Sequence, residues 1–571
     1  MEIPQIDSEQ LILDSCRRLT GPSLVWSETG AILDALVKDL DMEQVLDCWY
    51  RQLDGLLSQI GWENTELTHR RFENGFNLLI AAPIDQLYSA VEVLETAWYF
   101  CSCELLGLDV ESGDELIEAI RQQMRKEKNP PLLQLQAAAA SHGVDFLADD
   151  ELVSVGHGAG SASYAVDQIP APGSIDWASI HDIPVALITG TNGKSTSVRL
   201  LDGIARAAGQ TSGVTSTDFV RVGDDLLDRG DYSGPGGARL LLRDPRLEVA
   251  FLEVARGGIL RRGLPLRRAS AALVTNVASD HLGQYGVNTL KALTETKFTV
   301  SKALARDATL VVNADDDGIV EFLADDPGQH LCWFSLHRSK PRIQQQIDLR
   351  RRCCFSENGF LVSFDGEEFH QVCAIADIPM TLNGAAAHNV RNALGAVAIA
   401  SALGYSNQQM RDGLCRFNSD DSDNPGRLNS FTLANSARVI VDFAHNAHSV
   451  AAVTDTVGSM EARRKWALFG SAGDRSDDEI AAIAEGVCSI EPDHVVIVEL
   501  EDYLRGRQPG EVSEIMKLAC LRAGMPAERI HFAESPLAGV KLAIAEMQAD
   551  DLGLFLVLSE RDQVIEYVKS Q

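Results

Sequence analysis

The sequence has too few basic residues to balance its acidic ones. Lysine and arginine together number 50, against 82 aspartates and glutamates, which gives a formal net charge of −32 at pH 7. Nucleic-acid binding depends on cationic contacts with phosphates, so a chain with this charge does not present a general basic face to nucleic acid. We therefore expect no nucleic-acid partner, and any anionic ligand requires a local cluster of arginines or lysines.

Long apolar runs and paired cysteine motifs are also missing. No segment approaches the 18 or more apolar residues of a membrane span, and no apolar stretch follows a basic segment near the first residue. The 11 cysteines include no CxxC pair at metal-binding spacing. These absences predict a soluble, cytoplasmic protein without membrane association, whose cysteines are reduced and mostly buried.

The length of 571 residues predicts several domains rather than one. Residues 1–155 combine helical patterns with a strand-like run, which indicates a small α+β domain. Residues 156–180 are rich in glycine, alanine, serine and proline, and we predict a linker there. Residues 181–426 and 427–571 each alternate apolar strands with helical segments, which favours parallel sheets covered by helices. The predicted fold class is therefore α/β.

A glycine-rich turn follows the apolar run VALIT at residues 185–189 and leads into a helical pattern. A buried strand that enters a helix through such a turn presents backbone N–H groups to phosphates. Lys194 would supply a charge for the terminal phosphates, and Ser195 a hydroxyl for Mg²⁺. We predict that the chain binds a nucleoside triphosphate, with a strand–turn–helix that binds no ligand as the alternative. The predicted phosphate-binding residues are Gly190, Thr191, Asn192, Gly193, Lys194, Ser195 and Thr196.

Two further strands are followed by side chains that suit a metal site. Glu253 lies at the end of one apolar strand, and His281 lies in the segment after another. Open α/β sheets bind ligands at the carboxyl ends of their strands, beside the hydroxyl of Ser195. We predict Ser195, Glu253 and His281 as ligands of Mg²⁺. A surface strand end remains the alternative for Glu253, and a hydrogen-bonded helix cap for His281, because imidazole prefers softer metals.

A series of motifs resembles the Mur ligase family. In chain order they are GTNGKST (190–196), TSTD (215–218), LEVARGGILRRGL (252–264), TNVASDHLG (275–283), VVNADD (311–316), HNVRN (388–392), PGR (425–427) and DFAHN (442–446). Within the family, the chain is most similar to the Mur-ligase half of the cyanophycin synthetases, over roughly residues 181–565. The resemblance implies a multidomain Mur-ligase architecture: a small α+β N-terminal domain, a central P-loop ATPase domain with a parallel sheet, and a C-terminal Rossmann-like domain.

The residues before the glycine-rich turn resemble the same enzymes in part. RRLTGPSLVWS (17–27) is similar to their first domain, and DELVSVGHG (150–158) to the lead into their ATP-grasp ligase. In this chain the turn follows about thirty residues later, so no ATP-grasp domain intervenes. The resemblance therefore implies at most one ligation per chain, and a homo-oligomer or a separate ATP-grasp ligase as candidate partners.

Carried over residue by residue, the resemblance implies a ligase site that uses ATP and Mg²⁺. Lys194 would bind the β and γ phosphates, and Arg427 the transferring phosphate across a domain hinge. Lys297 occupies the position of a carbamylated lysine in many Mur ligases, with a solvated helix lysine as the alternative, and His445 would order the C-terminal side. The other implied residues are Asn389 and Asn392 near adenine, Asp442 at the ribose, Thr215, Thr217 and Asp218 near the acceptor carboxylate, and Asp474, Arg475 and Arg505 at the incoming amino acid.

The implied reaction joins a carboxylate to an amine. The acceptor carboxylate would attack the γ-phosphoryl group of ATP, and an amino acid or amine would attack the acyl phosphate, which gives an amide, ADP and phosphate. The acceptor would belong to a cyanophycin-like or related peptide. The alternative is a non-catalytic nucleotide-binding subunit that supports a partner ligase. A plain ATPase or GTPase switch gives no role to TSTD, HNVRN or DFAHN.

Overall fold

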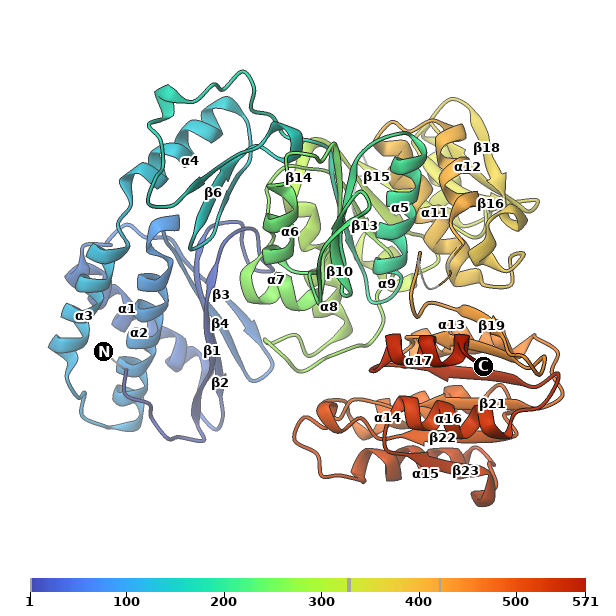
Figure 1. The fold of residues 1–571 in the computed structure, drawn as a ribbon. Coiled ribbons are helices and arrows are strands. Elements are labelled where there is room, and N and C mark those ends of the chain that lie inside the picture. Colours follow the sequence, from blue (N-terminus) through green and yellow to red (C-terminus); the bar gives the residue numbers. More distant parts are fainter. Residues whose placement is uncertain (1–2, 326–329, 419, 421–422) are drawn as a thin grey trace.

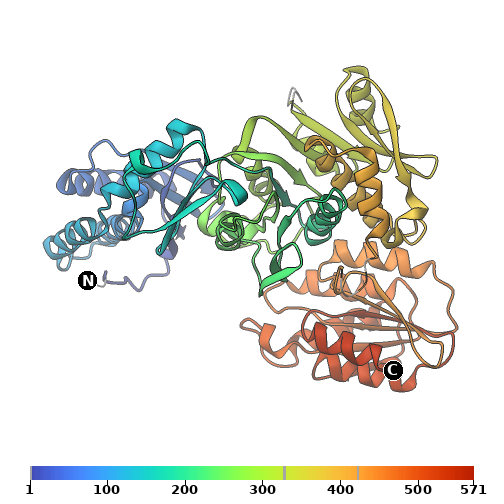
Figure 2. The ribbon, with the colours of Figure 1, turned by 45° about the horizontal axis from the view of Figure 1, so that its top comes forward.

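The computed structural model describes residues 3–325, 330–418, 420 and 423–571. They form an N-terminal part, a central part and a C-terminal part, and the outer two contact different sides of the central one (Figures 1 and 2). In the described ranges, no helix is long and apolar enough to cross a membrane. All eleven cysteines are free thiols and eight are buried, which confirms the prediction that most of them are buried.

The N-terminal part is built on a four-stranded antiparallel sheet with the order β1-β2-β4-β3. Its strands are β1 (Leu11–Leu19), β2 (Gly30–Val37), β3 (Leu67–Phe72) and β4 (Gly75–Ala81). Its helices are α1 (Met42–Ile60), α2 (Leu87–Leu106) and α3 (Gly113–Glu127). The apolar faces of these helices pack with the sheet around Trp49, which is fully buried. This arrangement agrees with the α+β prediction.

A second, smaller sheet connects this part to the central one. Its three strands, β5 (Phe146–Ala148), β6 (Leu152–Val155) and β7 (Ala162–Ala165), pair antiparallel. Helix α4 (Pro130–His142) packs against them. The sequence predicts a linker over 156–180, whereas the structure has β7 paired with β6 there, and Trp177 packs in the same apolar cluster. The linker prediction is wrong for β7. A short segment rich in alanine and serine has the composition of a linker, and only its pairing with β6 makes it a strand.

The central sheet has eleven strands, in the order β11-β10-β9-β12-β8-β13-β14-β15-β16-β17-β18. The strands are β8 (Val185–Thr189), β9 (Ser212–Thr215), β10 (Phe219–Val222), β11 (Asp225–Arg229), β12 (Val249–Glu253), β13 (Ala269–Val274), β14 (Leu304–Asn313), β15 (Leu331–Ser335), β16 (Cys353–Glu357), β17 (Phe360–Phe364) and β18 (Phe369–Ala374). Neighbours from β9 to β16 in this order pair in parallel, and the strands at both edges are antiparallel. The predicted α/β class is confirmed.

Helices cover both faces of the central sheet, so its middle strands are apolar throughout. On one face lie α5 (Lys194–Ala207), α11 (Ala387–Ala402) and α12 (Asn407–Arg416). On the other lie α6 (Pro235–Leu242), α7 (Arg256–Arg262), α8 (Leu290–Phe298), α9 (Asp317–Phe322) and α10 (Pro341–Asp348). Because helices bury both faces of this sheet, we expect the polar side chains of a site in the loops at the strand ends.

The C-terminal part contains a six-stranded sheet with the order β19-β20-β24-β21-β22-β23. Only β19 (Asn429–Thr432) pairs antiparallel; the parallel strands are β20 (Arg438–Asp442), β21 (Lys465–Phe469), β22 (His494–Val498), β23 (Ile530–Ala533) and β24 (Leu552–Leu556). Helices α13 (Ala447–Gly458), α14 (Asp477–Cys488) and α15 (Glu511–Arg522) pack on one face, and α16 (Pro536–Glu546) and α17 (Arg561–Lys569) on the other.

Candidate active site

A cleft of about 1400 Å³ lies between the central and C-terminal sheets. Its walls include the loops at the carboxyl ends of β8, β12 and β13, together with α11, the hinge at Arg427, and the loop after β20. Carboxyl ends of parallel strands are the usual ligand-binding edge of such sheets. The cleft therefore lies where the sequence predicts the site.

The turn from β8 into α5 depends on two glycines. Gly190 has φ +146° and Gly193 has φ +86°, values that L side chains rarely adopt. A Cβ at Gly190 would lie 1.8 Å from Thr275 Oγ1, and one at Gly193 would lie 2.3 Å from Asn392 Oδ1. Thr191 anchors the turn further, because its hydroxyl donates to Ala278 O at 3.1 Å. The turn is thus held against the loop after β13 and against α11.

Lys194 and Ser195 begin α5 and face the cleft. Lys194 Nζ donates to the backbone oxygens of Gly190 and Thr191, at 3.2 and 3.0 Å, so the cation lies across its own turn. Ser195 Oγ donates to Glu253 Oε2 at 2.8 Å. Burial raises the pKa of Glu253 above its usual range, although Lys194 and the Ser195 hydrogen bond oppose the shift. Glu253 is 3% exposed, which excludes the surface strand end as its environment.

Thr217 extends this group. Its backbone N–H donates to Glu253 Oε2 at 3.3 Å, and its hydroxyl lies 3.4 Å from Ser195 Oγ. Thr217 lines the cleft, whereas Thr215 and Asp218 are not among the lining residues. Thr215 is buried at the end of β9, and its role near an acceptor carboxylate stays a prediction.

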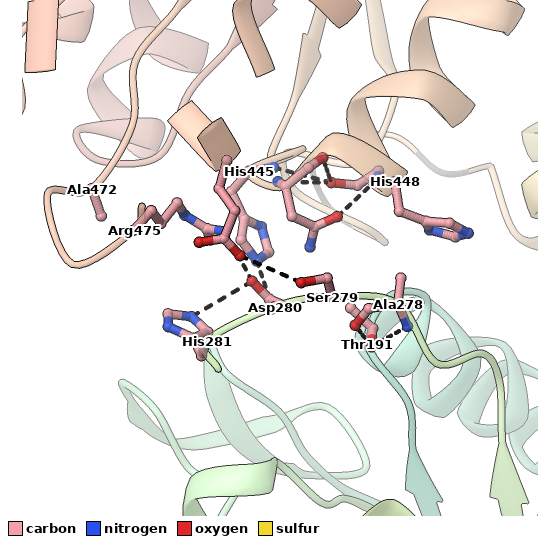
Figure 3. Close-up of polar contacts among 12 residues, drawn as sticks. Thr191, Ala278, Ser279, Asp280, His281, His445, His448, Ala472 and Arg475 are labelled. Carbon is pink, nitrogen blue, oxygen red and sulfur yellow. Dashed lines mark hydrogen bonds and ion pairs between the residues drawn. The ribbon is translucent and has the colours of Figure 1, made fainter. Parts of the chain in front are cut away.

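His281 lies in a cluster centred on Asp280 (Figure 3), and its role as a Mg²⁺ ligand beside Ser195 and Glu253 stays a prediction. Asp280 Oδ1 accepts from Arg475 Nη1 at 3.0 Å, and its carboxylate lies 3.8 Å from His445 Nε2 and 3.9 Å from His281 Nε2. Burial raises the pKa of Asp280, but His445, His281 and Arg475 outweigh it and hold the pKa well below its usual range. Asp280 therefore stays ionised and links the central part to the C-terminal part.

His281 also lies 3.5 Å from Asp474, and its backbone adopts φ +50°. Asp474 in turn pairs with Arg505, so the charges predicted for the incoming amino acid are already paired within the protein. Arg475 and Arg505 line the cleft. At this wall the carboxylates of Asp280 and Asp474 thus lie beside the guanidinium groups of Arg475 and Arg505 and the imidazoles of His281 and His445.

Lys297 projects from α8 into the same cleft. It is 4% exposed, which excludes a solvated helix lysine. Burial lowers the pKa of Lys297 well below its usual range, and Lys194 and Arg256 add to the shift while Asp280 opposes it. A buried amine with a lowered pKa is neutral over a wider pH range, and neutral amines are the nucleophilic form.

The wall formed by α11 carries the amides predicted to approach adenine. Asn389 and Asn392 are buried and hydrogen-bonded to each other at 3.3 Å, and Asn389 Nδ2 donates to Met380 O at 2.9 Å. Asp442 also lines the cleft, but its two carboxylate oxygens accept from the backbone N–H groups of Leu428 and Ala444. Asp442 thus fixes the hinge, and its predicted contact with ribose stays a prediction.

Three residues of this site were missed by sequence reasoning. Asp280 lay within the TNVASDHLG motif, next to the histidine that was singled out. Asn446 caps α13 and exchanges side-chain hydrogen bonds with Asn192 at 3.1 and 3.2 Å, which joins the phosphate turn to the C-terminal part. Arg561 donates to Asp218 Oδ1 at 2.6 Å from α17. Asp280 and Asn446 both lie in motifs quoted from the sequence, TNVASDHLG and DFAHN, whereas nothing in the sequence marked Arg561.

Asp218 belongs to an arginine cluster at the hinge. Besides Arg561 it pairs with Arg199, a fully buried residue of α5. Burial raises the pKa of Asp218, but Arg427, Arg199 and Arg561 outweigh it and lower the pKa below its usual range. Arg427 lines the cleft and lies over the ring of Phe443, 4.6 Å from its centroid.

Known proteins match both large sheets. The Mur ligase middle domain model matches residues 188–400, and the Mur ligase, glutamate ligase domain model matches residues 426–556. The solved structure of E. coli FolC in complex with DHPP and ADP aligns with a TM-score of 0.48 and 20% identity, covering 68% of this chain and 89% of that one.

The curated relatives include ligases of two kinds. Cyanophycin synthetase of Nostoc sp. is 36% identical over 58% of this chain and 37% of its own length, and that of Synechocystis sp. is 33% identical over 68% and 44%. The UDP-N-acetylmuramoyl-L-alanyl-D-glutamate–2,6-diaminopimelate ligase of Vibrio vulnificus is 27% identical over 66% of this chain and 73% of its own. The chain thus spans less than half the length of these cyanophycin synthetases. With both domain models matched along most of its central and C-terminal parts, the chain belongs to the Mur ligase family.

Proposed function

We propose that this protein is an ATP-dependent carboxylate–amine ligase that acts through an acyl phosphate and releases ADP and phosphate. One observation carries the proposal: the phosphate turn with Lys194, Ser195 and Glu253 shares a cleft with Asp280, His445 and Arg475, which link the two large parts of the chain. A nucleotide and a second substrate can meet in such a cleft.

The residues of the phosphate turn suit γ-phosphoryl transfer. Lys194 provides a fixed cation at the turn, and Arg427 provides a second from the hinge; both stabilise charge that develops on the transferring oxygens. Ser195 and Glu253 offer the hard oxygen ligands that Mg²⁺ prefers, and Mg²⁺ bound there would neutralise phosphate charge. Their 2.8 Å hydrogen bond shows that the two oxygens converge on one point.

The C-terminal part then shields the acyl phosphate from water. The hydrogen bond between Asn192 and Asn446 joins the phosphate turn to the start of α13. Arg475, in the loop before α14, joins the C-terminal part to Asp280 of the central part. An acyl phosphate exposed to solvent would hydrolyse and waste ATP, so covering it favours attack by the amine. We assign Arg475 and Arg505 to the side on which the amine enters, because both line the cleft there.

The acceptor in this proposal is a carboxylate of a cyanophycin-like or related peptide, and the amine is an amino acid. The cyanophycin synthetases among the relatives support this assignment, although the matched region is only 37% and 44% of their length. A non-catalytic subunit that binds nucleotide for a partner ligase is the second candidate. The presence of the phosphate turn, of Ser195 with Glu253 and of Arg427 in one cleft favours catalysis, because together they can bind Mg²⁺ and balance charge on a transferring phosphate.

The experiment that tests the proposal is a product screen by mass spectrometry. The protein is incubated with ATP, Mg²⁺, a panel of amino acids and short aspartyl or glutamyl peptides. We expect a peptide product heavier by one amino-acid residue, and its loss by 10²-fold or more in Lys194→Ala, because an electrostatic stabiliser of the transition state is removed.

Lys291→Ala is the matched control, since Lys291 is exposed on α8. Equal product yield from Lys194→Ala and the unmodified protein would contradict the proposal. Nucleotide binding without any product in the whole panel, together with restored ligation on adding a partner ligase, would support the non-catalytic subunit instead.

A further inference from the structure

One arm of the cleft carries four arginines that phosphoryl transfer does not use. Arg239 lies on α6, and Arg256, Arg261 and Arg262 lie on α7; all four line the cleft. The chain as a whole has a net charge of −32, so a cationic wall here is a local exception to its composition. Such a cluster costs electrostatic energy unless an anion balances it.

The arginines are only partly paired. Arg239 Nε and Arg256 Nη1 are buried polar atoms without a hydrogen-bond partner, while Arg239 Nε lies 3.9 Å from Asp149 and Arg256 Nη2 donates to Gln284. Burial lowers the pKa of Arg239, Arg256 and Arg262, and in each case a neighbouring arginine adds to the shift. Asp231, which also lines the arm, already accepts two hydrogen bonds from Ser233. These two guanidinium nitrogens thus lack the hydrogen bonds that buried polar atoms normally have, and both arginines line the cleft.

The backbone around the arginines leaves room for a ligand. A Cβ at Gly236 would meet nothing within 4 Å, and one at Gly257 would meet only the Arg261 side chain, at 3.8 Å. Both glycines line the arm, so neither side chain nor backbone fills it at these points. The arginines and the phosphate turn line the same cleft, so a ligand of several linked groups can reach from one to the other.

The N-terminal part braces the arm. Arg17 Nε donates to Leu260 O at 2.9 Å, and the backbone N–H of Thr20 donates to Arg262 O at 2.8 Å. Arg262 Nη1 in turn donates to Arg18 O at 3.4 Å. These contacts fix the last turn of α7, and with it the guanidinium of Arg262, from outside the central part.

We infer that this arm binds the acceptor, and that the acceptor carries several carboxylates besides the one that reacts. The inference rests on the proposed function, because the reacting end of the acceptor must reach the phosphate turn. Guanidinium groups bind carboxylates through paired, charge-assisted hydrogen bonds. Phosphate chains share this oxyanion chemistry, but the reacting group in the proposed chemistry is a carboxylate, so an oligomer of acidic residues is the ligand class that fits.

The test measures binding directly, without ligation. Fluorescently labelled tetra-aspartate is titrated with the full chain, and anisotropy gives Kd at two salt concentrations. We expect Arg239→Gln/Arg262→Gln to raise Kd by about ten-fold or more, because charge-assisted hydrogen bonds are lost. Arg261→Gln, at an exposed position where folding is not at risk, should raise it by a smaller factor. Arg306→Gln, exposed on β14 outside the cleft, should leave it unchanged.

Two further readouts separate this inference from the proposed function. Binding of a fluorescent ATP analogue should be the same in all variants, since the phosphate turn is intact. Tetra-aspartate should bind more tightly than a tetrapeptide with one aspartate and three alanines. Equal Kd values for the double variant and the unmodified protein, or tighter binding of tripolyphosphate than of tetra-aspartate, would overturn the inference. Arginine-dependent binding without any ligated product would instead count against the proposed reaction alone.

Discussion

Lys297 is the residue whose chemistry depends most on its surroundings. It is nearly inaccessible on α8, next to the cations Lys194 and Arg256, and its pKa is lowered by burial and by both of them. A protonated amine there would add to a local excess of positive charge. Conversion to a carbamate would replace that cation with an anion and reverse its effect on a nearby metal ion.

Replacing Lys297 tests this chemistry. Lys297→Ala should lower kcat by about 10²-fold, because a group that organises charge in the site is lost. Added short carboxylic acids should restore part of the activity by supplying an anion. Lys291→Ala, on the exposed side of the same helix, serves as the control. Full activity of Lys297→Ala would show that the lysine only fills space.

The pH dependence of kcat follows from the lowered pKa of Lys297. Only the neutral amine can form a carbamate, so activity should be retained at neutral pH and lost as the pH falls through that lowered pKa. A pH profile measured in bicarbonate-containing buffer should therefore show an acid limb. The limb should be missing from the residual activity of Lys297→Ala, and its persistence there would assign it to another group.

At the scale of elements, the turn between β8 and α5 is where backbone conformation matters most. Gly193 at its end and Gly209 just after α5 both have positive φ, +86° and +81°. A Cβ at Gly193 would lie 2.3 Å from Asn392 Oδ1, whereas one at Gly209 would meet nothing within 4 Å. A substitution at either position would therefore strain the backbone in a similar way, but only one at Gly193 would also collide with α11.

Alanine at these two positions separates strain from contact. Gly209→Ala should lower the free energy of unfolding by roughly 1–2 kcal/mol through its left-handed backbone alone, with ATP binding intact. Gly193→Ala should cost more and should also weaken ATP binding, because the phosphate turn must move away from Asn392. Thermal unfolding and nucleotide titration measure both effects. Equal behaviour of the two variants would mean that α11 does not constrain the turn.

The sequence predicts elements best where the determining contacts are local. VALITGTNGKST specifies a buried strand, a turn that needs glycine and a helix within one short segment, and the structure confirms β8 and α5. The strand β7 was mistaken for linker because only its pairing with β6 defines it. Likewise, Asp280 and Arg475 lie 195 residues apart, and their 3.0 Å contact depends on how two separate sheets are placed.

At the scale of the whole molecule, α17 adds contacts that join the C-terminal part to the central part. Arg561 on α17 donates to Asp218, and a Cβ at Gly426 of the hinge would lie 2.5 Å from Arg561 Cδ. Both charged side chains are mostly buried. A second pair, Arg229 with Asp562, crosses the same boundary at 3.6 Å but is largely exposed to solvent.

A double-mutant cycle compares these two pairs. Asp218→Asn and Arg561→Gln should show a coupling energy of about 0.5–3 kcal/mol, as side chains in direct contact do. The cycle on Arg229 and Asp562 should give less than about 1 kcal/mol, because solvent screens an exposed pair. Chemical unfolding measures both. A coupling energy for the buried pair no larger than for the exposed one would contradict its role at the boundary.

Acid should weaken the same boundary. The pKa of Asp218 is lower in the folded protein than its ordinary value, since three arginines outweigh the effect of burial. Its contribution to stability is therefore complete above that ordinary value and is lost as the pH falls toward the lowered one. Unfolding free energies measured between pH 5 and pH 3 should drop less steeply in Asp218→Asn than in the unmodified protein. An equal slope would show that other carboxylates govern acid stability.

The central claim is that a carboxylate is activated as an acyl phosphate, and isotope transfer tests it most directly. The acceptor peptide is labelled with ¹⁸O in its carboxyl groups and incubated with ATP, Mg²⁺ and the amino acid that gives product. Formation of an acyl phosphate transfers one carboxyl oxygen to the departing phosphate, so we predict ADP together with inorganic phosphate that carries a single ¹⁸O per amide formed. Appearance of AMP that carries the label, or of unlabelled phosphate beside ligated product, would contradict the account.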